Sequence, residues 1–343
     1  MSQRENGNPR REQNHRKNSR RYQKRAAARR RRNTIFIVEI VLLLILAVVL
    51  FFMSKLSKIE KTKLDMDKIE VNEDISQESQ KIMKGYQTIA MFGLDNRSNG
   101  NLSQGRSDVI MLANINNDTK EVKLVSVYRD TYLDTGDGIF QKCNAAYAKG
   151  GPEQAISMLN VNLDLNITEY VTVDFNSIIE CVDLLGGVDM EITDDEASLM
   201  TGYIRELNEL TGNKAENLTQ GGTYTLNGVQ ACAYARIRYG GGDDYRRTER
   251  QRTVLTAMVK KAQQSDLTTV NKLINEVCGD IQTSFSNAEL LALASQVFQY
   301  SIGDTTGFPF TKTTKVLSKK TGDVVIPCDL SDNVKELHIF LYE

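Results

Sequence analysis

The sequence lacks the groups on which several common enzyme mechanisms depend. Only two of its 343 residues are histidine, His15 and His338, so Ser-His-Asp, Cys-His and phosphohistidine mechanisms lack their usual base. Its five cysteines form no CxxC pair, which leaves zinc and thioredoxin-type sites without support, and no GxxxxGKS/T segment provides a P-loop for nucleotides. Any chemistry must therefore be carried by carboxylates, arginines and hydroxyls, with or without a divalent ion.

Charge is divided unevenly along the chain. Residues 1–33 contain 13 Lys and Arg against two acids, a net charge of +11, whereas the remainder carries 30 bases and 42 acids, a net charge of −12. The basic tail is followed by 20 mainly apolar residues, 34–53, with one charge, Glu39. At ~1.5 Å per residue such a helix spans the roughly 30 Å hydrocarbon core of a bilayer. The sequence therefore predicts an uncleaved membrane anchor.

The basic residues before the anchor determine the predicted topology. Under the positive-inside rule they keep the N-terminus in the cytoplasm and place the rest of the chain outside the cell. The predicted organisation is a cytoplasmic tail (1–33), a single transmembrane helix (34–54), a stalk (55–85) and an extracellular catalytic domain (86–343). The tail could attract nucleic acid, but its position beside a membrane span explains its charge more simply. We therefore expect no nucleic-acid partner.

Apolar segments in the body of the chain predict strands that alternate with helices. We expect strands at 88–94, 108–115, 121–127, 170–175 and 188–192, and helices at 153–163, 176–185, 248–264 and 333–342, with two or three more helices in 266–300. A polar, helix-prone insertion occupies roughly 194–220. This alternation indicates a single α/β domain, with a central mixed sheet flanked by helices.

Charged residues gather in three segments near predicted strand ends and Gly-rich turns, where α/β folds place their sites. One interpretation is a solvated charge run on the surface, where each ion pair contributes under about 1 kcal/mol. The three clusters together instead favour one anion-binding site. Their residues are Asp95, Arg97, Arg106 and Asp108 in the first, Arg129 and Asp130 in the second, and Arg236, Arg238, Asp243, Asp244, Arg246, Arg247, Arg250, Gln251 and Arg252 in the third.

The spacing within the third cluster supports convergence on one anion. Arg236 and Arg238 are two residues apart, so on an extended segment they point the same way. Arg247 and Gln251 are four apart and share one face of a helix. Guanidinium groups bind phosphate oxygens in bidentate pairs and keep their charge, which suits a pyrophosphate.

Two carboxylates of the first cluster predict a metal ion beside that anion. Asp95 and Asp108 would repel the phosphates unless a cation lay between them. Carboxylates together with phosphate oxygens are a normal ligand set for Mg²⁺, or for Mn²⁺ in its place.

These segments, in this order and spacing, resemble the LytR-CpsA-Psr family of Gram-positive cell-wall enzymes. The matching motifs within residues 88–260 are GLDNRS, GRSDVIML, VSVYRDTYL, KCNAAYAKGG, LLGGVDMEI, LNGVQACAYARIRY and DDYRRTERQR. The resemblance implies transfer of a glycopolymer (teichoic acid, capsule or another secondary wall polysaccharide) from a polyprenyl-pyrophosphate carrier to peptidoglycan. In the absence of an acceptor, hydrolysis of the pyrophosphate is the implied side activity.

The resemblance also implies roles for individual residues. Asp95 and Asp108 would hold Mg²⁺, and Asp244 and Gln251 would complete the pocket by orienting the arginines or the acceptor hydroxyl. Our own hypothesis for the reaction is that Asp108 or Asp244 accepts the proton of that hydroxyl. An apolar tunnel between sheet and helices would take the lipid. The pyrophosphate would be bound by Arg97, Arg106, Arg129, Arg236, Arg238, Arg247, Arg250 and Gln251. We predict Arg129, Arg238, Asp108 and Asp244 as the catalytic residues, and we expect loss of Arg129 or Arg238 to reduce turnover by orders of magnitude.

Two positions depart from the family pattern. Tyr128 stands where proline is usual before the arginine, and Arg252 stands where a second glutamine is usual. Neither change removes a group that the mechanism needs.

A noncatalytic lipid-carrier or glycan-binding protein and a membrane-bound regulator are the alternative functions.

Overall fold

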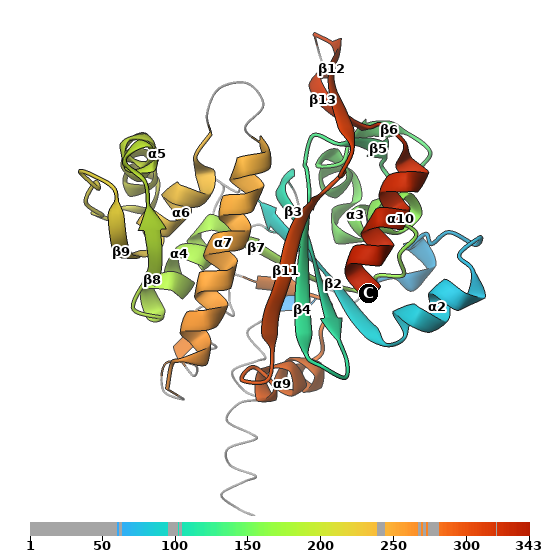
Figure 1. Cartoon of the computed structure of the whole chain (residues 1–343), viewed down its shortest axis with the longest axis horizontal. Coiled ribbons are helices and arrows are strands. Elements are labelled where there is room, and N and C mark those ends of the chain that lie inside the picture. Colours follow the sequence, from blue (N-terminus) through green and yellow to red (C-terminus); the bar gives the residue numbers. More distant parts are fainter. Residues whose placement is uncertain are drawn as a thin grey trace, which may run out of the picture. The chain divides into compact units, whose positions relative to one another are not determined.

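A seven-stranded mixed sheet forms the centre of the domain (Figure 1). The computed structural model describes residues 60–61, 64–94, 102, 105–238, 244–266, 269, 272–273, 281–319 and 321–343. Strand β3 is antiparallel to both of its neighbours, β2 and β4, whereas β2 is parallel to β7 and β4 to β11. In spatial order the strands are β1 (Glu60–Lys61), β10 (Ile281–Thr283), β7 (Glu169–Asp174), β2 (Tyr86–Leu94), β3 (Ser107–Asn116), β4 (Glu121–Val127) and β11 (Ser301–Phe308). The predicted α/β fold with a central mixed sheet is confirmed.

Helices cover both faces of this sheet. On one face α3 (Ala145–Leu163) and α10 (Leu330–Tyr342) bury apolar side chains of β2, β3 and β4. On the other face α7 (Asp244–Gln263) and α9 (Asn287–Ser295) pack against the alternate residues of the same strands. Because both faces are covered, β3 is buried along most of its length and reads as a nearly continuous apolar run.

A second hydrophobic cluster lies beside the sheet, around α6 (Gly228–Arg236) and α7 (Figure 1). It is completed by α4 (Phe175–Leu184), by α5 (Asp194–Thr211) and by the hairpin of β8 (Val188–Ile192) and β9 (Gly222–Leu226). The insertion at 194–220 is thus a packed part of the domain, with four apolar residues of α5 buried. A capping box between Thr193 and Glu196 begins that helix.

Residues 64–83, which we expected to lie in a stalk, contact α3. The backbone N–H of Asp65 donates to Glu153 Oε1 at 2.8 Å, and that of Glu70 donates to Ser157 Oγ at 3.0 Å. Two short helices in this segment, η1 (Met66–Lys68) and α2 (Gln77–Met83), lead into β2. The predicted anchor and basic tail lie outside the described residues, and no helix inside the described ranges is long and apolar enough to cross a membrane.

The C-terminal third contains strands that the sequence did not predict. Between 266 and 300, where we expected two or three helices, the described residues form β10 and α9, and residues 269 and 272–273 are helical as well. Strand β10 is three residues long, too short to show a period, and β11 is an edge strand with few apolar residues. Two hairpins lie beside each other in Figure 1. One pairs β5 (Tyr132–Asp134) with β6 (Phe140–Lys142), and the other pairs β12 (Lys312–Ser318) with β13 (Gly322–Pro327).

Candidate functional site

The topology of the sheet brings the charged segments together at one end. Because β3 runs antiparallel to β4, the start of β3 lies beside the end of β4. Met111 pairs with Ser126, and continuing this register places Asp108 opposite Arg129. Arg129 Nη1 is 2.7 Å from Asp108 Oδ1. Two of the three predicted clusters therefore meet.

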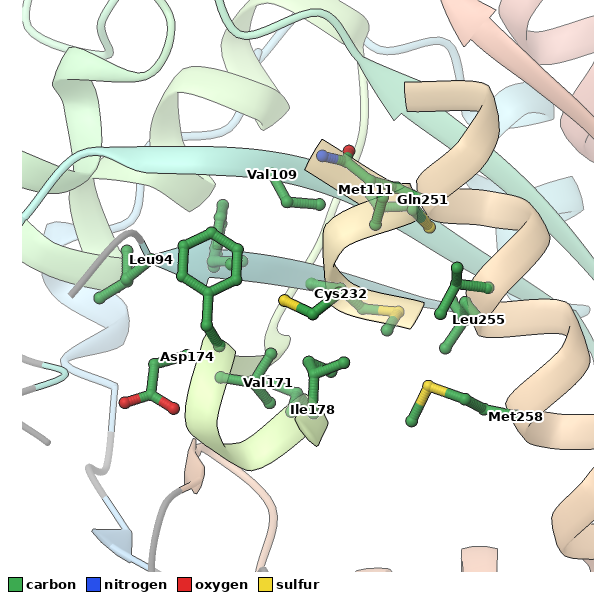
Figure 2. Close-up of a pocket in the computed structure, with 17 residues that line it drawn as sticks. Leu94, Val109, Met111, Val171, Asp174, Ile178, Cys232, Gln251, Leu255 and Met258 are labelled. Atoms are coloured by element: carbon green, nitrogen blue, oxygen red, sulfur yellow. The ribbon is translucent and has the colours of Figure 1, made fainter. Parts of the chain in front are cut away.

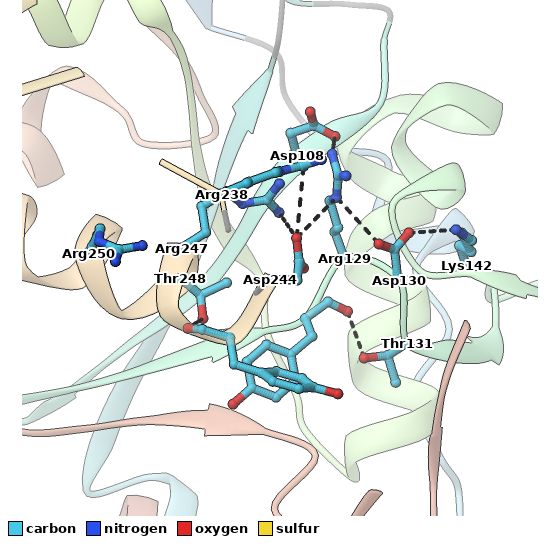
Figure 3. A network of polar contacts seen from close by, with 12 residues as sticks. Asp108, Arg129, Asp130, Thr131, Lys142, Arg238, Asp244, Arg247, Thr248 and Arg250 are labelled. Atoms are coloured by element: carbon cyan, nitrogen blue, oxygen red, sulfur yellow. Dashed lines mark hydrogen bonds and ion pairs between the residues drawn. The ribbon is translucent and has the colours of Figure 1, made fainter. Parts of the chain in front are cut away.

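Asp244, at the start of α7, links the third cluster to the other two (Figure 3). Its Oδ1 lies 2.6 Å from Arg247 Nη2, 3.6 Å from Arg129 Nε and 3.8 Å from Arg238 Nη2. One carboxylate thus holds three guanidinium groups near one another against their mutual repulsion. Arg129 follows β4, Arg238 follows α6 and Arg247 belongs to α7, so Arg129 is far from the other two in the sequence.

Burial and charge act in opposite directions on the groups of this cluster. Burial raises the pKa of Asp244 to about 6, although the Arg129 guanidinium opposes the rise. Burial lowers the pKa of Arg129, but the nearby carboxylates of Asp108, Asp244 and Asp130 raise it by more. The net pKa of Arg129 is therefore raised, and the arginine stays charged.

Within the described residues, Asp244 Oδ2, Arg247 Nε and Gln251 Oε1 are buried without a hydrogen-bond partner. Such groups indicate a site organised for a ligand.

The arginines line a cavity of about 240 Å³, the arginine pocket. Asp108 and Gln251 also line it, as do two aromatic residues that we did not predict, Phe175 and Tyr203. The full set of predicted residues in its wall is Asp108, Arg129, Arg236, Arg238, Arg247 and Gln251. Asp244 does not line the pocket. It therefore affects a ligand through the arginines that it contacts.

An apolar cavity, the slot, adjoins the arginine pocket (Figure 2). It lies between the sheet and the helices α4, α6 and α7, and its walls include Met111, Val171 and Leu255. The slot and the arginine pocket share Val109, Phe175 and Gln251. An anion in the pocket could therefore carry an apolar tail into the slot.

Arg236 reaches the pocket differently from the way we predicted. It is the last residue of α6, so it does not share an extended segment with Arg238, and the spacing argument for this pair was wrong. Its guanidinium stacks over Phe175 at 5.0 Å and pairs with Glu206 at 3.2 Å. Glu206 and Tyr203 belong to α5, within the insertion, where no motif indicated a role in the site.

Besides Asp244, two predicted residues that the structure describes, Arg106 and Arg250, do not line the arginine pocket. Arg106 is exposed and lines a neighbouring polar groove together with Asp108 and Arg129. Asp95 and Arg97 lie outside the described residues. Arg250 points away, because its Nε is 3.1 Å from Glu196 Oε1 and its Nη1 donates to the carbonyl of Ile237.

Arg250 is expected to act in folding. Its side chain and that of Glu196 are 8% and 15% exposed, so Arg250→Ala would leave a largely buried carboxylate without its cation. We expect the free energy of unfolding to fall by about 3 kcal/mol. Urea denaturation of the variant measures this, with the exposed Arg205→Ala as the matched control. Equal stability of the two variants would contradict the structural role.

The two residues that depart from the family pattern, Tyr128 and Arg252, lie close together in the structure. The Tyr128 ring packs edge-on against Tyr245 at 4.6 Å, and Lys312 Nζ lies over both rings. Burial raises the pKa of Tyr128, and the nearby positive charge of Arg252 opposes the rise. Tyr128 thus joins the end of β4, next to Arg129, to the start of α7, next to Asp244.

Comparison with known proteins agrees with the resemblance seen in the motifs. The LytR_cpsA_psr family model matches residues 46–315. The polyisoprenyl-teichoic acid–peptidoglycan teichoic acid transferase TagU of Enterococcus faecalis is 30% identical over 210 residues, 60% of this chain and 64% of that protein. Biofilm regulatory protein A of Streptococcus mutans is 31% identical over 208 residues, 57% of this chain and 49% of that protein. The chain thus spans about half to two thirds of the length of these relatives.

A solved structure shares the fold. TagT of Bacillus subtilis, with bound octaprenyl pyrophosphate lipid, superposes with a TM-score of 0.58 at 21% identity, covering 82% of this chain and 99% of that one. The order of the motifs, the fold and the match of the family model lead to one conclusion. This chain belongs to the LytR-CpsA-Psr family.

Proposed function

We propose that the chain is a phosphotransferase that moves a glycopolymer from a polyprenyl-pyrophosphate carrier to peptidoglycan. The observation that carries this proposal is the slot, which shares Val109, Phe175 and Gln251 with a pocket lined by four arginines. A lipid-linked pyrophosphate has this combination of a long apolar tail and a compact, highly charged head. TagU is named as a teichoic acid transferase, and the TagT structure contains a polyprenyl pyrophosphate, which supports the same ligand class here.

The slot is narrow, at about 120 Å³, and a long isoprenoid has to widen it. Three of its lining residues are methionines, Met91, Met111 and Met258. Methionine side chains are unbranched and change rotamer readily, so they can yield to a flexible tail. The apolar walls then stabilise the tail by removing it from water.

In the proposed reaction the arginines stabilise charge on the phosphates. Arg129, Arg238 and Arg247 bind the pyrophosphate and the departing lipid phosphate, where negative charge increases as the bond breaks. Asp108 lines the pocket and accepts the proton of the acceptor hydroxyl. Asp244 positions the three arginines, which its distances to them support.

Mg²⁺, or Mn²⁺, is part of the proposal. Asp108 fits such a site because its carboxylate lines the pocket, where phosphate oxygens would complete the ligand set. The ion pair between its Oδ1 and Arg129 holds the carboxylate in place. Asp95 is the proposed second ligand and lies outside the described residues. Within the described ranges no three His, Cys, Asp or Glu residues form a metal-binding group. A bound cation would neutralise part of the charge on the pyrophosphate.

The proposed location is the outer face of the cell membrane. Support comes from the sequence alone, from the apolar block at 34–54 and the basic residues before it. In this arrangement the tail lies in the cytoplasm, and the domain lies where both the lipid carrier and peptidoglycan are accessible.

The proposed function is tested with the full chain in detergent, a polyprenyl-pyrophosphate-linked oligosaccharide, peptidoglycan strands and Mg²⁺. We expect a phosphodiester-linked product and release of polyprenyl phosphate, with slow hydrolysis when the acceptor is omitted. Tight binding of the donor without any turnover would favour a noncatalytic carrier and contradict the proposal.

The slot yields a separate prediction. Ala235 of α6 lines it, so Ala235→Trp places a large ring in the path of the tail. We expect the KM for a long-chain donor to rise about tenfold, the loss of roughly 1.4 kcal/mol of burial, while a glycan-pyrophosphate donor without an isoprenoid tail is unaffected. Ala292→Trp, at an exposed position of α9, is the control. An equal effect on both donors would place the tail outside the slot.

A further inference from the structure

A third cavity, the polar groove, adjoins the arginine pocket on a side away from the slot. It encloses about 720 Å³, and its walls come from the start of β3, from the β5–β6 hairpin and from the β12–β13 hairpin through Thr321. The groove shares Asp108 and Arg129 with the arginine pocket but shares no lining residue with the slot. The arginine pocket therefore lies between the slot and the groove. Figure 3 shows Asp130 and Lys142, both groove residues, on the other side of Arg129 from Arg238 and Arg247.

The groove has the surface of a saccharide site. Phe140 is 53% exposed, and its ring lies 6.0 Å from that of Tyr132, so the two form an aromatic platform at the wall. The C–H faces of a pyranose pack on such rings, whose faces carry negative charge. Polar groups surround the platform, among them Gln141 and the Lys142–Asp130 ion pair at 2.8 Å. A flat apolar surface among hydrogen-bonding groups suits a sugar better than a lipid or a lone phosphate.

Asn144 gives independent support for a ligand in the groove. Its side chain lines the groove and is 4% exposed, and its Oδ1 accepts no hydrogen bond from the described residues. Buried amide oxygens are almost always paired in native proteins. A hydroxyl or an acetamido N–H of a sugar supplies the missing donor.

The direction of phosphoryl transfer decides which sugar occupies the groove. With the tail in the slot, the lipid phosphate leaves toward the slot, and an in-line displacement requires the nucleophile to approach from the opposite side. The glycan is bonded to the transferred phosphorus through another oxygen, which does not lie on the line that joins the nucleophile and the leaving oxygen. The cavity across the arginine pocket from the slot is thus the entry of the acceptor.

We propose that the polar groove binds the acceptor, a strand of N-acetylated amino sugars of peptidoglycan, and directs its hydroxyl at the glycan-bearing phosphorus. This inference rests on the proposed function. In the step, the acceptor oxygen forms a bond to that phosphorus, and the bond from phosphorus to the lipid phosphate oxygen breaks. The hydroxyl proton passes to Asp108, which lines both cavities, and the lipid phosphate departs with the electron pair.

The test replaces the aromatic platform and follows each substrate separately. With Phe140→Ala in the full chain, we expect the KM for peptidoglycan strands to rise about tenfold, the loss of roughly 1.4 kcal/mol of aromatic contact, while the KM for the lipid-linked donor stays the same. Phe140→Trp should restore the acceptor KM. The control is Phe298→Ala, an equally exposed phenylalanine (57%) that does not line the groove.

The outcomes separate this inference from the proposed function. A rise in the donor KM instead of the acceptor KM would assign the groove to the donor glycan and overturn the inference, as would no change in either value. A second measurement needs no turnover: a soluble β-1,4-linked oligosaccharide of N-acetylated amino sugars should bind the wild-type chain in calorimetry and bind Phe140→Ala about tenfold more weakly. Equal binding by both proteins would also overturn the inference. A wild-type chain that binds the oligosaccharide but never cleaves the donor would contradict the proposed function alone.

Discussion

Arg129→Ala is expected to lower transfer by about 10³-fold, the largest loss for any single substitution in the site. Arg129 lines both the arginine pocket and the polar groove, so it lies where the transferred phosphorus would be attacked. Its guanidinium also pairs with Asp108 and approaches Asp244, which fixes its orientation. Removing a preorganised charge of this kind typically raises the barrier by about 3–4 kcal/mol.

Steady-state transfer with a lipid-linked donor measures this effect, and a second variant separates charge from geometry. Arg129→Lys keeps the positive charge but cannot form a bidentate pair with phosphate, so we expect activity between those of the wild type and Arg129→Ala. Circular dichroism and urea denaturation of each variant check the fold, and the exposed Arg205→Ala should remain fully active. Near-normal transfer by both Arg129→Ala and Arg238→Ala would refute the role of the arginine pocket.

Asp244→Asn is expected to lower kcat/KM by about 100-fold and to remove the acid limb of the pH profile. The ionised carboxylate holds Arg129, Arg238 and Arg247 close together. Because burial raises the pKa of Asp244 to about 6, the carboxylate is ionised above this pH and protonated below it. In the wild type, kcat/KM should therefore fall about tenfold per pH unit below pH 6.

The comparison of the two pH profiles identifies the titrating group. The asparagine carries no ionisable proton, so its low activity should not decline further through pH 6. If wild type and variant share the same acid limb, another group is responsible and the assignment to Asp244 fails. Lys142→Gln, which removes a charge in the groove, serves as a control because it should leave the acid limb in place.

The sequence predicted the parts of the fold that depend on local pattern. Strands β2, β3 and β4 are long enough to show their apolar runs, and their order with the helices indicated an α/β domain. Strand β10 has three residues and β11 is an edge strand, so neither produces a pattern that a single sequence reveals. Their pairing is determined by neighbours far away in the chain.

The same contrast holds for the site. Helix spacing predicted that Arg247 and Gln251 share one face, and both line the pocket. The pairing of Asp108 with Arg129 depends on the register of two antiparallel strands and was not predicted. The position of Arg236 was misjudged because its segment is helical, which a run of alanines and apolar residues does not distinguish from a strand. Arg250 pairs with Glu196 across 54 residues, a contact that no local spacing predicts.

Residues from hairpins and from the insertion were beyond the reach of motif reasoning. Tyr203 lines the arginine pocket, and Glu206 pairs with Arg236, only because α5 packs on α6. Phe140 and Tyr132 form the aromatic platform only when β5 pairs with β6. In each case the tertiary contact, and not the residue type, creates the feature.

A structure of the full chain with a polyprenyl pyrophosphate is the most direct measurement of the central claim. The account predicts phosphate oxygens within hydrogen-bond distance of Arg129, Arg238 and Arg247, and the isoprenoid tail between the sheet and α7. A ligand bound elsewhere, with these three guanidinium groups still paired to carboxylates of the protein and to no phosphate, would contradict it.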